Sequence, residues 1–168
     1  MKALLIIAPS RFRDEEYFHT KEMLEKSIIG TVTASRTKGE ADGSMGAKVN
    51  VGMALTDVDL NAYEAVVFIG GGGSSVYFND PVALRLAKQA WDSGKVVAAI
   101  CVAPSILANA GILNGKKVTA WVDKQPNLVA KGAIWTGEPV TVDGKLVTAN
   151  GPKAAKEFGR AIARVMKS

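Results

Sequence analysis

Cys101 is the residue whose position in the sequence best suits covalent chemistry. It directly follows the apolar run 96–100, which is typical of a buried strand, and Pro104 can open a helix three residues later. A nucleophile on such a strand-to-helix turn forms a nucleophile elbow. Amides at a helix N-terminus favour a thiolate, so the pattern predicts a Cys101 pKa below that of a free thiol. The alternative is that a lone cysteine is only a small buried apolar side chain.

Four glycines, residues 70–73, follow another apolar run at 65–69. Glycines let backbone amides approach a ligand closely, which suits an oxyanion hole or an anion-binding loop. The alternative is a flexible turn. A phosphate-binding P-loop is disfavoured because no Lys-Ser or Lys-Thr pair follows. A dinucleotide site is disfavoured because the glycines follow the third parallel strand and no acidic residue ends the next one.

Glu16 lies in the first turn of a helix expected at about residues 14–26. A carboxylate there ordinarily complements the helix dipole. If the strand before this helix is adjacent to the strand that ends at Cys101, however, the Glu16 carboxyl can reach the sulfur. Beside a thiolate in a partly dry site, it would be pushed toward protonation and could donate a hydrogen bond. Asp14 and Glu15 are interpreted as ordinary first-turn acids.

The elements that must position these residues alternate between apolar strands and amphipathic helices. This alternation predicts an α/β domain of flavodoxin-like, three-layer architecture, with a parallel sheet and helices on both faces. A single domain over residues 1–168 is expected. Strict alternation around Asp143-Gly144 predicts a β-hairpin at 140–148 near the C-terminus, and residues 37–50 are an irregular segment or an edge hairpin. The predicted strands are 3–8, 31–35, 65–69, 96–100 and 117–121, and the predicted helices are about 14–26, 81–91, 104–110, 126–131 and 152–166.

Composition excludes several classes of function. The formal charge is +5 from 21 basic and 16 acidic residues, but the basic residues are dispersed, so we expect no nucleic-acid binding. One cysteine and one histidine allow no intramolecular disulfide and no structural zinc site. The first apolar run is too short for a signal peptide or a membrane span. We therefore expect a cytoplasmic protein that does not bind membranes.

Several segments together resemble the ThiJ/PfpI superfamily, which includes the protein deglycases and the PfpI intracellular proteases. The resemblance covers nearly the whole chain, and its most specific part is the Cys-x-x-Pro elbow. The matching segments are the first strand from Lys2 to Ala8, Phe12 to Glu16, Phe68-Ile69-Gly70-Gly71, Ala99 to Pro104 with Leu107-Ala108, Ala110 to Leu113, and Gly115 to Thr119.

The resemblance implies specific roles for the residues of the site. Cys101 is the implied nucleophile, Glu16 its carboxyl partner, and the amides of Gly71 and Val102 the implied oxyanion hole. The substrate pocket is expected to be lined by Gly70, Gly72, Ala103 and Trp121. We expect neither a metal nor a cofactor. The resemblance also implies a homodimer or larger homo-oligomer, which exposed aromatic residues such as Tyr17, Phe18 or Trp135 would favour.

The sequence departs from peptidase-like members of the superfamily in its lack of a base. Those members carry a histidine directly after the cysteine, where this chain has Val102; other members carry one some twenty residues later, where it has Trp121. The sole histidine, His19, is interpreted as a surface or interface residue. The downstream His-x-Glu of glutamine amidotransferases is also absent. A Cys-His-Asp peptidase triad is therefore not available within one subunit.

The remaining chemistry is that of a Cys-Glu pair acting on a small electrophile. The prediction is a glyoxalase III-type or protein deglycase-like enzyme whose substrate is a small aldehyde such as methylglyoxal, or a glycated protein. One alternative is a non-catalytic stress-response protein whose Cys101 is an oxidation sensor. Another is a PfpI-type cysteine peptidase, or a hydrolase or hydratase acting on another small molecule.

Overall fold

The apolar runs of the sequence form the middle of a six-stranded sheet. Its strands are β1 (Lys2–Ile6), β3 (Gly30–Ala34), β6 (Ala65–Phe68), β7 (Val96–Ile100), β10 (Val140–Asp143) and β11 (Leu146–Ala149). In space they run in the order β10-β11-β7-β6-β1-β3 in the computed structural model, which describes residues 1–168. Every residue of β6 and β7 is buried, as central strands covered on both faces must be.

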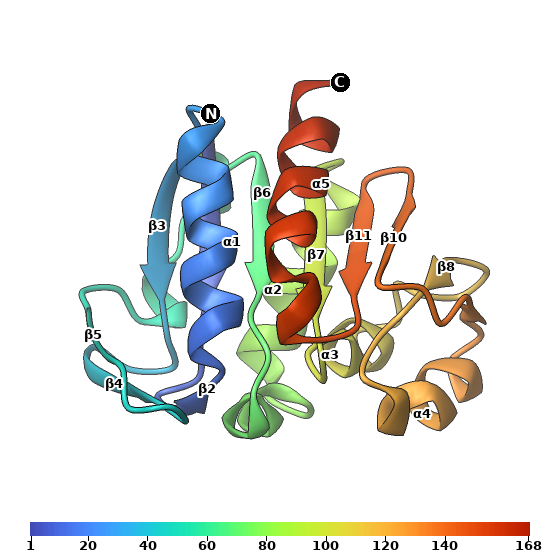
Figure 1. The fold of residues 1–168 in the computed structure, drawn as a ribbon, viewed down its shortest axis with the longest axis horizontal. Coiled ribbons are helices and arrows are strands. Elements are labelled where there is room, and N and C mark those ends of the chain that lie inside the picture. The colour runs from blue at the N-terminus through green and yellow to red at the C-terminus, as the bar shows by residue number, and fades with distance from the viewer.

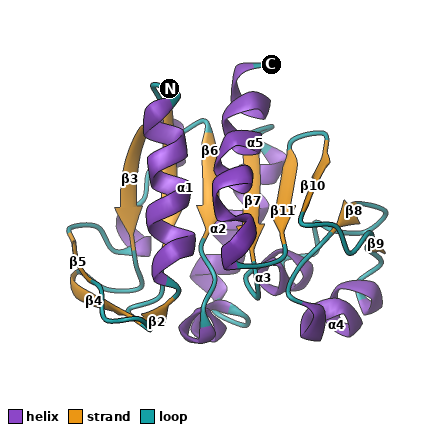
Figure 2. Ribbon diagram, viewed as in Figure 1, coloured by secondary structure: helices purple, strands orange, loops and turns teal.

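Helices cover both faces of this sheet, which gives three layers (Figures 1 and 2). On one face α1 (Asp14–Lys26) packs beside α5 (Ala155–Lys167). On the other lie α2 (Pro81–Asp92) and α3 (Pro104–Asn109). The predicted flavodoxin-like α/β fold is confirmed. None of the helices is both long and apolar enough to cross a bilayer.

The predicted C-terminal hairpin is present, and its second strand has a further role. Strand β10 pairs antiparallel with β11, and β11 then pairs parallel with β7. The hairpin therefore extends the central sheet, and the loop after β11 lies next to the loop after β7.

The predicted strand at 117–121 is mostly wrong. Only Lys117–Val118 is extended, as β8, and it pairs with β9 (Ile134–Trp135) outside the central sheet. Beyond it, the Thr119 amide donates to the Thr148 hydroxyl and the Trp121 amide donates to the Cys101 carbonyl. These contacts replace strand pairing. The chain then enters α4 (Gln125–Ala130).

The polar segment at 37–50 forms the edge hairpin that was one of its two interpretations. Strands β4 (Gly39–Gly43) and β5 (Lys48–Val51) pair antiparallel, and β2 (Ser10–Phe12) joins β4 as an unpredicted third strand. This small sheet lies beside the start of α1 (Figure 1). Short 3-10 helices occur at Leu55–Asp57, Leu60–Ala62, Gly72–Tyr77, Val122–Lys124 and Pro152–Ala154.

Candidate active site

Glu16 and Cys101 come together although their strands are not neighbours. Strand β6 lies between β1, which leads to α1, and β7, which ends at Cys101. Gly70, which follows β6 closely, makes the approach possible. A Cβ atom at Gly70 would lie 2.5 Å from Glu16 Oε1 and 2.7 Å from Cys101 Cβ. The absence of a side chain at this position therefore lets the carboxyl and the thiol share one site.

The Cys101 backbone has the strained geometry of a nucleophile elbow. Its φ is 64°, in the left-handed region that side chains other than glycine rarely adopt. The turn is held on both sides: the Cys101 amide donates to the Ala149 carbonyl at 2.9 Å, and the Cys101 carbonyl accepts from the Trp121 amide at 2.8 Å. This strain presents the sulfur at the end of β7, ahead of α3, as the sequence predicted.

The Glu16 carboxyl is buried without a regular hydrogen-bond partner. The side chain is 0% exposed, and neither carboxyl oxygen meets the geometry of a hydrogen bond. Burial raises the pKa of Glu16 to about 7. The Cys101 thiol, the charge of Arg13 and the Gly70 amide lie close enough to offset this effect in part. A carboxyl with such a pKa can both accept and donate a proton near neutral pH.

The predicted low pKa of Cys101 is wrong. Burial, followed by the charge and hydrogen bonding of Glu16, raises the pKa of the Cys101 thiol to about 12. The Val102 and Gly71 amides lower this pKa, but burial and Glu16 outweigh them. The helix N-terminus, on which the prediction rested, stabilises the thiolate less than burial and the Glu16 carboxylate destabilise it. The thiol therefore needs Glu16 as a base to become a nucleophile.

The amides of Gly71 and Val102 lie near the Cys101 sulfur, because both lower the pKa of its thiol. Gly71 has φ 106°, and a Cβ atom there would run into the backbone of Arg13 and Arg11. A glycine is thus required for this amide to reach its position. An oxyanion hole needs donors of this kind, close to an oxygen on the carbon that is bound to the sulfur.

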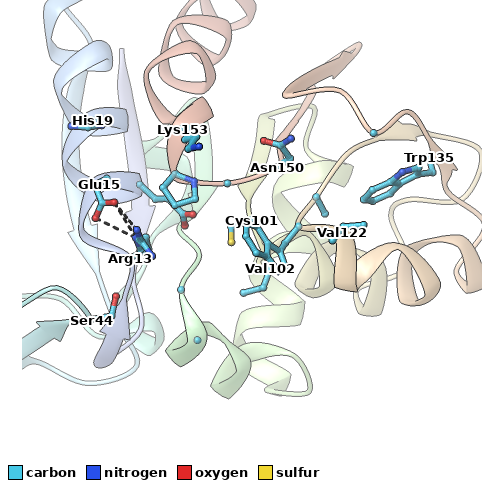
Figure 3. A pocket seen from close by; sticks show the side chains of 18 residues that line it. Arg13, Glu15, His19, Ser44, Cys101, Val102, Val122, Trp135, Asn150 and Lys153 are labelled. Atoms are coloured by element: carbon cyan, nitrogen blue, oxygen red, sulfur yellow. Dashed lines mark hydrogen bonds and ion pairs between the residues drawn. The ribbon is translucent and has the colours of Figure 1, made fainter.

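A cleft of about 1190 Å³ opens above the sulfur (Figure 3). Of the predicted pocket residues, Gly72 and Trp121 line it. Gly70 and Ala103 do not line it, and both are buried. The lining residues are Arg13, Glu15, Glu16, His19, Ser44, Gly71, Gly72, Cys101, Val102, Ala120, Trp121, Val122, Trp135, Gly137, Asn150, Gly151, Pro152 and Lys153.

Comparison with known proteins identifies the family of this chain. Residues 1–165 match the sequence profile of the DJ-1/PfpI family. The chain belongs to the DJ-1/PfpI family. It is 38% identical to an uncharacterized protein of Methanocaldococcus jannaschii over 99% of this chain and 82% of that one. It is 32% identical to a deglycase of Thermococcus kodakarensis over 89% and 90% of the two chains.

Solved structures agree with this assignment. A ThiJ/PfpI domain protein from Brachyspira murdochii superposes with a TM-score of 0.96 at 34% identity, over 99% of this chain and 96% of that one. Other relatives of this DJ-1/PfpI-family chain carry the names deglycase and putative cysteine protease. The resemblance inferred from the sequence motifs is therefore confirmed for the family.

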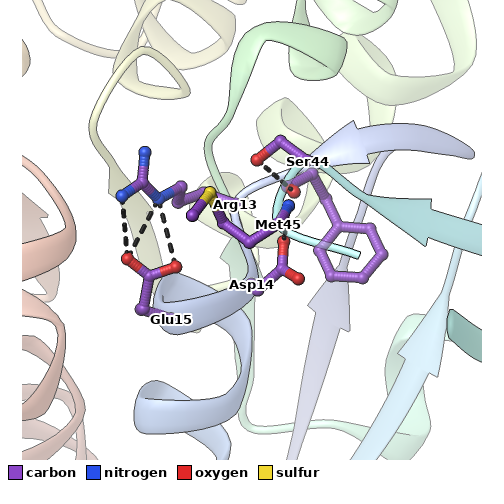
Figure 4. A network of polar contacts seen from close by, with 6 residues as sticks. Arg13, Asp14, Glu15, Ser44 and Met45 are labelled. Carbon is purple, nitrogen blue, oxygen red and sulfur yellow. Dashed lines mark hydrogen bonds and ion pairs between the residues drawn. The ribbon is translucent and has the colours of Figure 1, made fainter. Parts of the chain in front are cut away.

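In this DJ-1/PfpI-family protein the acids before Glu16 are more than ordinary first-turn residues. The buried Asp14 carboxylate accepts from the Met45 amide at 3.0 Å (Figure 4). It also accepts from the Ala47 amide at 2.9 Å, and the two bonds fix the β4–β5 turn. Glu15 instead holds Arg13 through an ion pair of 2.8 Å. The first turn of α1 thus organises one wall of the cleft.

Several residues of the cleft were missed by sequence analysis. Asn150 follows β11 directly, at the same sheet edge as Cys101, and Lys153 lies just beyond it. The rule that ligands bind beyond the carboxyl ends of parallel strands would have found both, had 146–149 been assigned to the central sheet. His19, interpreted as a surface or interface residue, is half-buried and lines the cleft. No three His, Cys, Asp or Glu side chains are grouped to hold a metal ion.

The buried Glu16 predicts a pH-dependent stability difference between wild type and Glu16→Gln. Folding raises the Glu16 pKa from 4.5 to about 7, so its contribution to stability is complete below about pH 4.5 and is lost as pH rises through about 7. We expect the free energy of unfolding of Glu16→Gln, relative to wild type, to increase by about 3 kcal/mol between about pH 4 and pH 8. Urea unfolding at both pH values measures this difference, and parallel pH profiles would contradict the raised pKa.

Proposed function

We propose that this protein is a cysteine-dependent enzyme that converts small 2-oxoaldehydes to 2-hydroxycarboxylates, a glyoxalase III-type activity. The observation that carries the proposal is the unpaired, buried Glu16 carboxyl beside a cysteine on a strained elbow. The amides of Gly71 and Val102 complete the arrangement. Methylglyoxal consumption with identification of lactate as the product tests the proposal.

The first step is attack of the thiol on the aldehyde. The sulfur forms a bond to the aldehyde carbon while Glu16 takes the thiol proton and passes it to the aldehyde oxygen, which gives a hemithioacetal. The pKa of about 7 suits this transfer, because the carboxyl is ionised in part of the molecules and gives its proton back readily. The amides of Gly71 and Val102 stabilise the oxyanion as it develops.

The second step moves a hydrogen between carbons. Glu16 removes the proton from the former aldehyde carbon and returns one to the neighbouring carbonyl carbon, through an enediol. The hydroxyl proton on the former aldehyde oxygen is lost, and the neighbouring oxygen gains one. The product is a thioester on Cys101, which water hydrolyses to a 2-hydroxycarboxylate, a proton and the free thiol. No oxidant or cofactor is consumed, because one carbon is oxidised as its neighbour is reduced.

The same attack accounts for a deglycase activity. Adducts of methylglyoxal with thiols and amines are in equilibrium with the free aldehyde, so removal of the aldehyde restores the modified group. The names of the deglycase relatives support this extension. Glycated proteins are thus a second candidate substrate.

An oxidation sensor is a second candidate function, favoured by the same unpaired carboxyl. A protonated Glu16 can donate a hydrogen bond to a Cys101 sulfinate, which would stabilise that oxidation state. Mass spectrometry after mild peroxide treatment tests this reading. Sulfinate formation in a wild type without aldehyde-converting activity would favour the sensor over the enzyme.

Peptidase activity is expected to be absent or trivial. The residue after the nucleophile is Val102, and the indole of Trp121 cannot act as a base. The only histidine, His19, lies across the cleft on α1 (Figure 3). Incubation of the protein with casein and fluorogenic peptides measures the peptidase activity. Cleavage that disappears in Cys101→Ser would show that a base comes from elsewhere, and would support the peptidase alternative.

We further propose a homodimer or larger homo-oligomer in the cytoplasm. The aromatic residues expected to favour assembly differ in exposure: Phe18 is 44% exposed and Trp135 partly exposed, but Tyr17 is buried, with its hydroxyl 2.7 Å from that of Thr33. Exposed Phe18 on α1 is the better support. Light scattering across a dilution series is expected to give a multiple of the chain mass, and a single-chain mass at micromolar concentration would contradict the proposal.

A further inference from the structure

Arg13 places a positively charged guanidinium in the cleft, and some of its hydrogen-bond donors have no partner in the protein. Its amide donates to the Gly70 carbonyl at 2.9 Å, so the residue is anchored to the loop after β6. Its side chain bonds Glu15 through Nε and Nη2, at 3.1 and 2.8 Å. Nη1 has no hydrogen-bond partner in the protein (Figure 4). The guanidinium is near enough to Cys101 and Glu16 for their charges to act on it.

Lys153 supplies a second cation on another wall. It lines the cleft next to Asn150, above Cys101 in Figure 3, and it is exposed. It takes part in no ion pair within the protein, whereas the one partly exposed acid of the cleft, Glu15, is already paired with Arg13. Positive charge on this side of the cleft is therefore left without a protein partner.

The cleft is also larger than methylglyoxal requires. Its volume of about 1190 Å³ is slightly above the range of about 300 to 1,000 Å³ that is typical of pockets for drug-sized ligands. A three-carbon aldehyde bound at Cys101 would fill only a small part of this volume. A longer substrate would reach these side chains while its aldehyde stays at the sulfur.

We propose that the cleft selects 2-oxoaldehydes whose far end carries a carboxylate or phosphate, which Arg13 and Lys153 bind. The inference rests on the proposed function and names its substrate class. A guanidinium matches a carboxylate or phosphate with two parallel hydrogen bonds, and an ammonium adds a point charge. The reaction at Cys101 is unchanged, because the anionic group takes no part in it.

The first test compares 4,5-dioxopentanoate, a 2-oxoaldehyde with a terminal carboxylate, with methylglyoxal. The wild type is expected to prefer the anionic aldehyde in kcat/KM. This preference should fall about threefold or more in Arg13→Gln and in Lys153→Met, and with added salt. Arg85→Gln, on α2 at the opposite face of the sheet, removes the same charge and should leave the preference unchanged. An equal preference in wild type and both cleft variants would overturn the proposal.

The second test does not depend on turnover. Cys101 is the only cysteine, so its alkylation by iodoacetate and by iodoacetamide compares an anionic with a neutral reagent at one sulfur. The ratio of the two rates should fall about threefold or more in Arg13→Gln and Lys153→Met but not in Arg85→Gln. If no aldehyde is turned over, the proposed function fails, and a falling ratio still supports anion selection. An unchanged ratio would overturn anion selection even in an active enzyme.

Discussion

Replacing Cys101 by serine is expected to lower methylglyoxal conversion by about a thousandfold or more. A serine hydroxyl loses its proton far less readily than a thiol, and a carboxyl with a pKa of about 7 is too weak a base to remove it. The hydroxyl is also the poorer leaving group when the acyl intermediate is hydrolysed. The rate of aldehyde loss, with lactate determined enzymatically, measures the effect.

A matched control separates chemistry from folding in this variant. Serine is close to cysteine in size, so Cys101→Ser should unfold in urea near the wild-type midpoint. Ser105→Ala, in the neighbouring helix α3, changes a buried hydroxyl that does not line the cleft, and should retain activity. A Cys101→Ser variant that is folded and converts methylglyoxal at the wild-type rate would show that Cys101 does not act as a covalent catalyst.

Replacing Glu16 by glutamine is expected to lower the aldehyde-converting rate by at least about tenfold to a hundredfold. General acid-base transfer contributes on the order of 10² to 10⁴ in rate, and Glu16 is the only carboxyl placed beside the sulfur. Glutamine keeps a donor for the sulfur but cannot accept a proton from the hemithioacetal carbon. Cys101 should therefore remain alkylatable while turnover is lost.

The control for Glu16→Gln lies on the same helix. Glu22→Gln removes a surface carboxylate of α1 that pairs with Lys26, and should leave the rate unchanged. If Glu16→Gln converts methylglyoxal at the wild-type rate, Glu16 does not transfer the proton and serves only at the start of helix α1. Loss of both turnover and alkylation would instead indicate that Glu16 is needed to form the nucleophile at all.

The sequence alone predicted most of the helices and strands and the position of Cys101 on a strand-to-helix turn. The unbroken apolar run 96–100 could form only a strand buried on both faces, and the glycines and prolines marked where strands and helices change. The Cys101 turn was predictable because small residues and Pro104 follow the strand directly. These signals come from residues that are neighbours in the chain, so a single sequence contains them.

Features that depend on residues close in space but distant in sequence could not be predicted. The meeting of Glu16 and Cys101 depends on Gly70, a residue of the intervening strand's loop, and no spacing in the sequence shows that contact. The Cys101 pKa was wrong because its largest cause is burial by side chains remote in sequence. Asn150 and Lys153 were missed because 146–149 was seen as half of a hairpin and not as a neighbour of β7.

The proton transfer by Glu16 from a Cys101 adduct is the central claim, and the conversion of methylglyoxal in heavy water tests it most directly. The wild type should form lactate that carries deuterium at the former ketone carbon, because the proton returned there exchanges with solvent through Glu16. Cys101→Ser and Glu16→Gln should form little or none. Absence of lactate from the wild-type reaction, or lactate that keeps the aldehyde hydrogen in every molecule, would contradict the account.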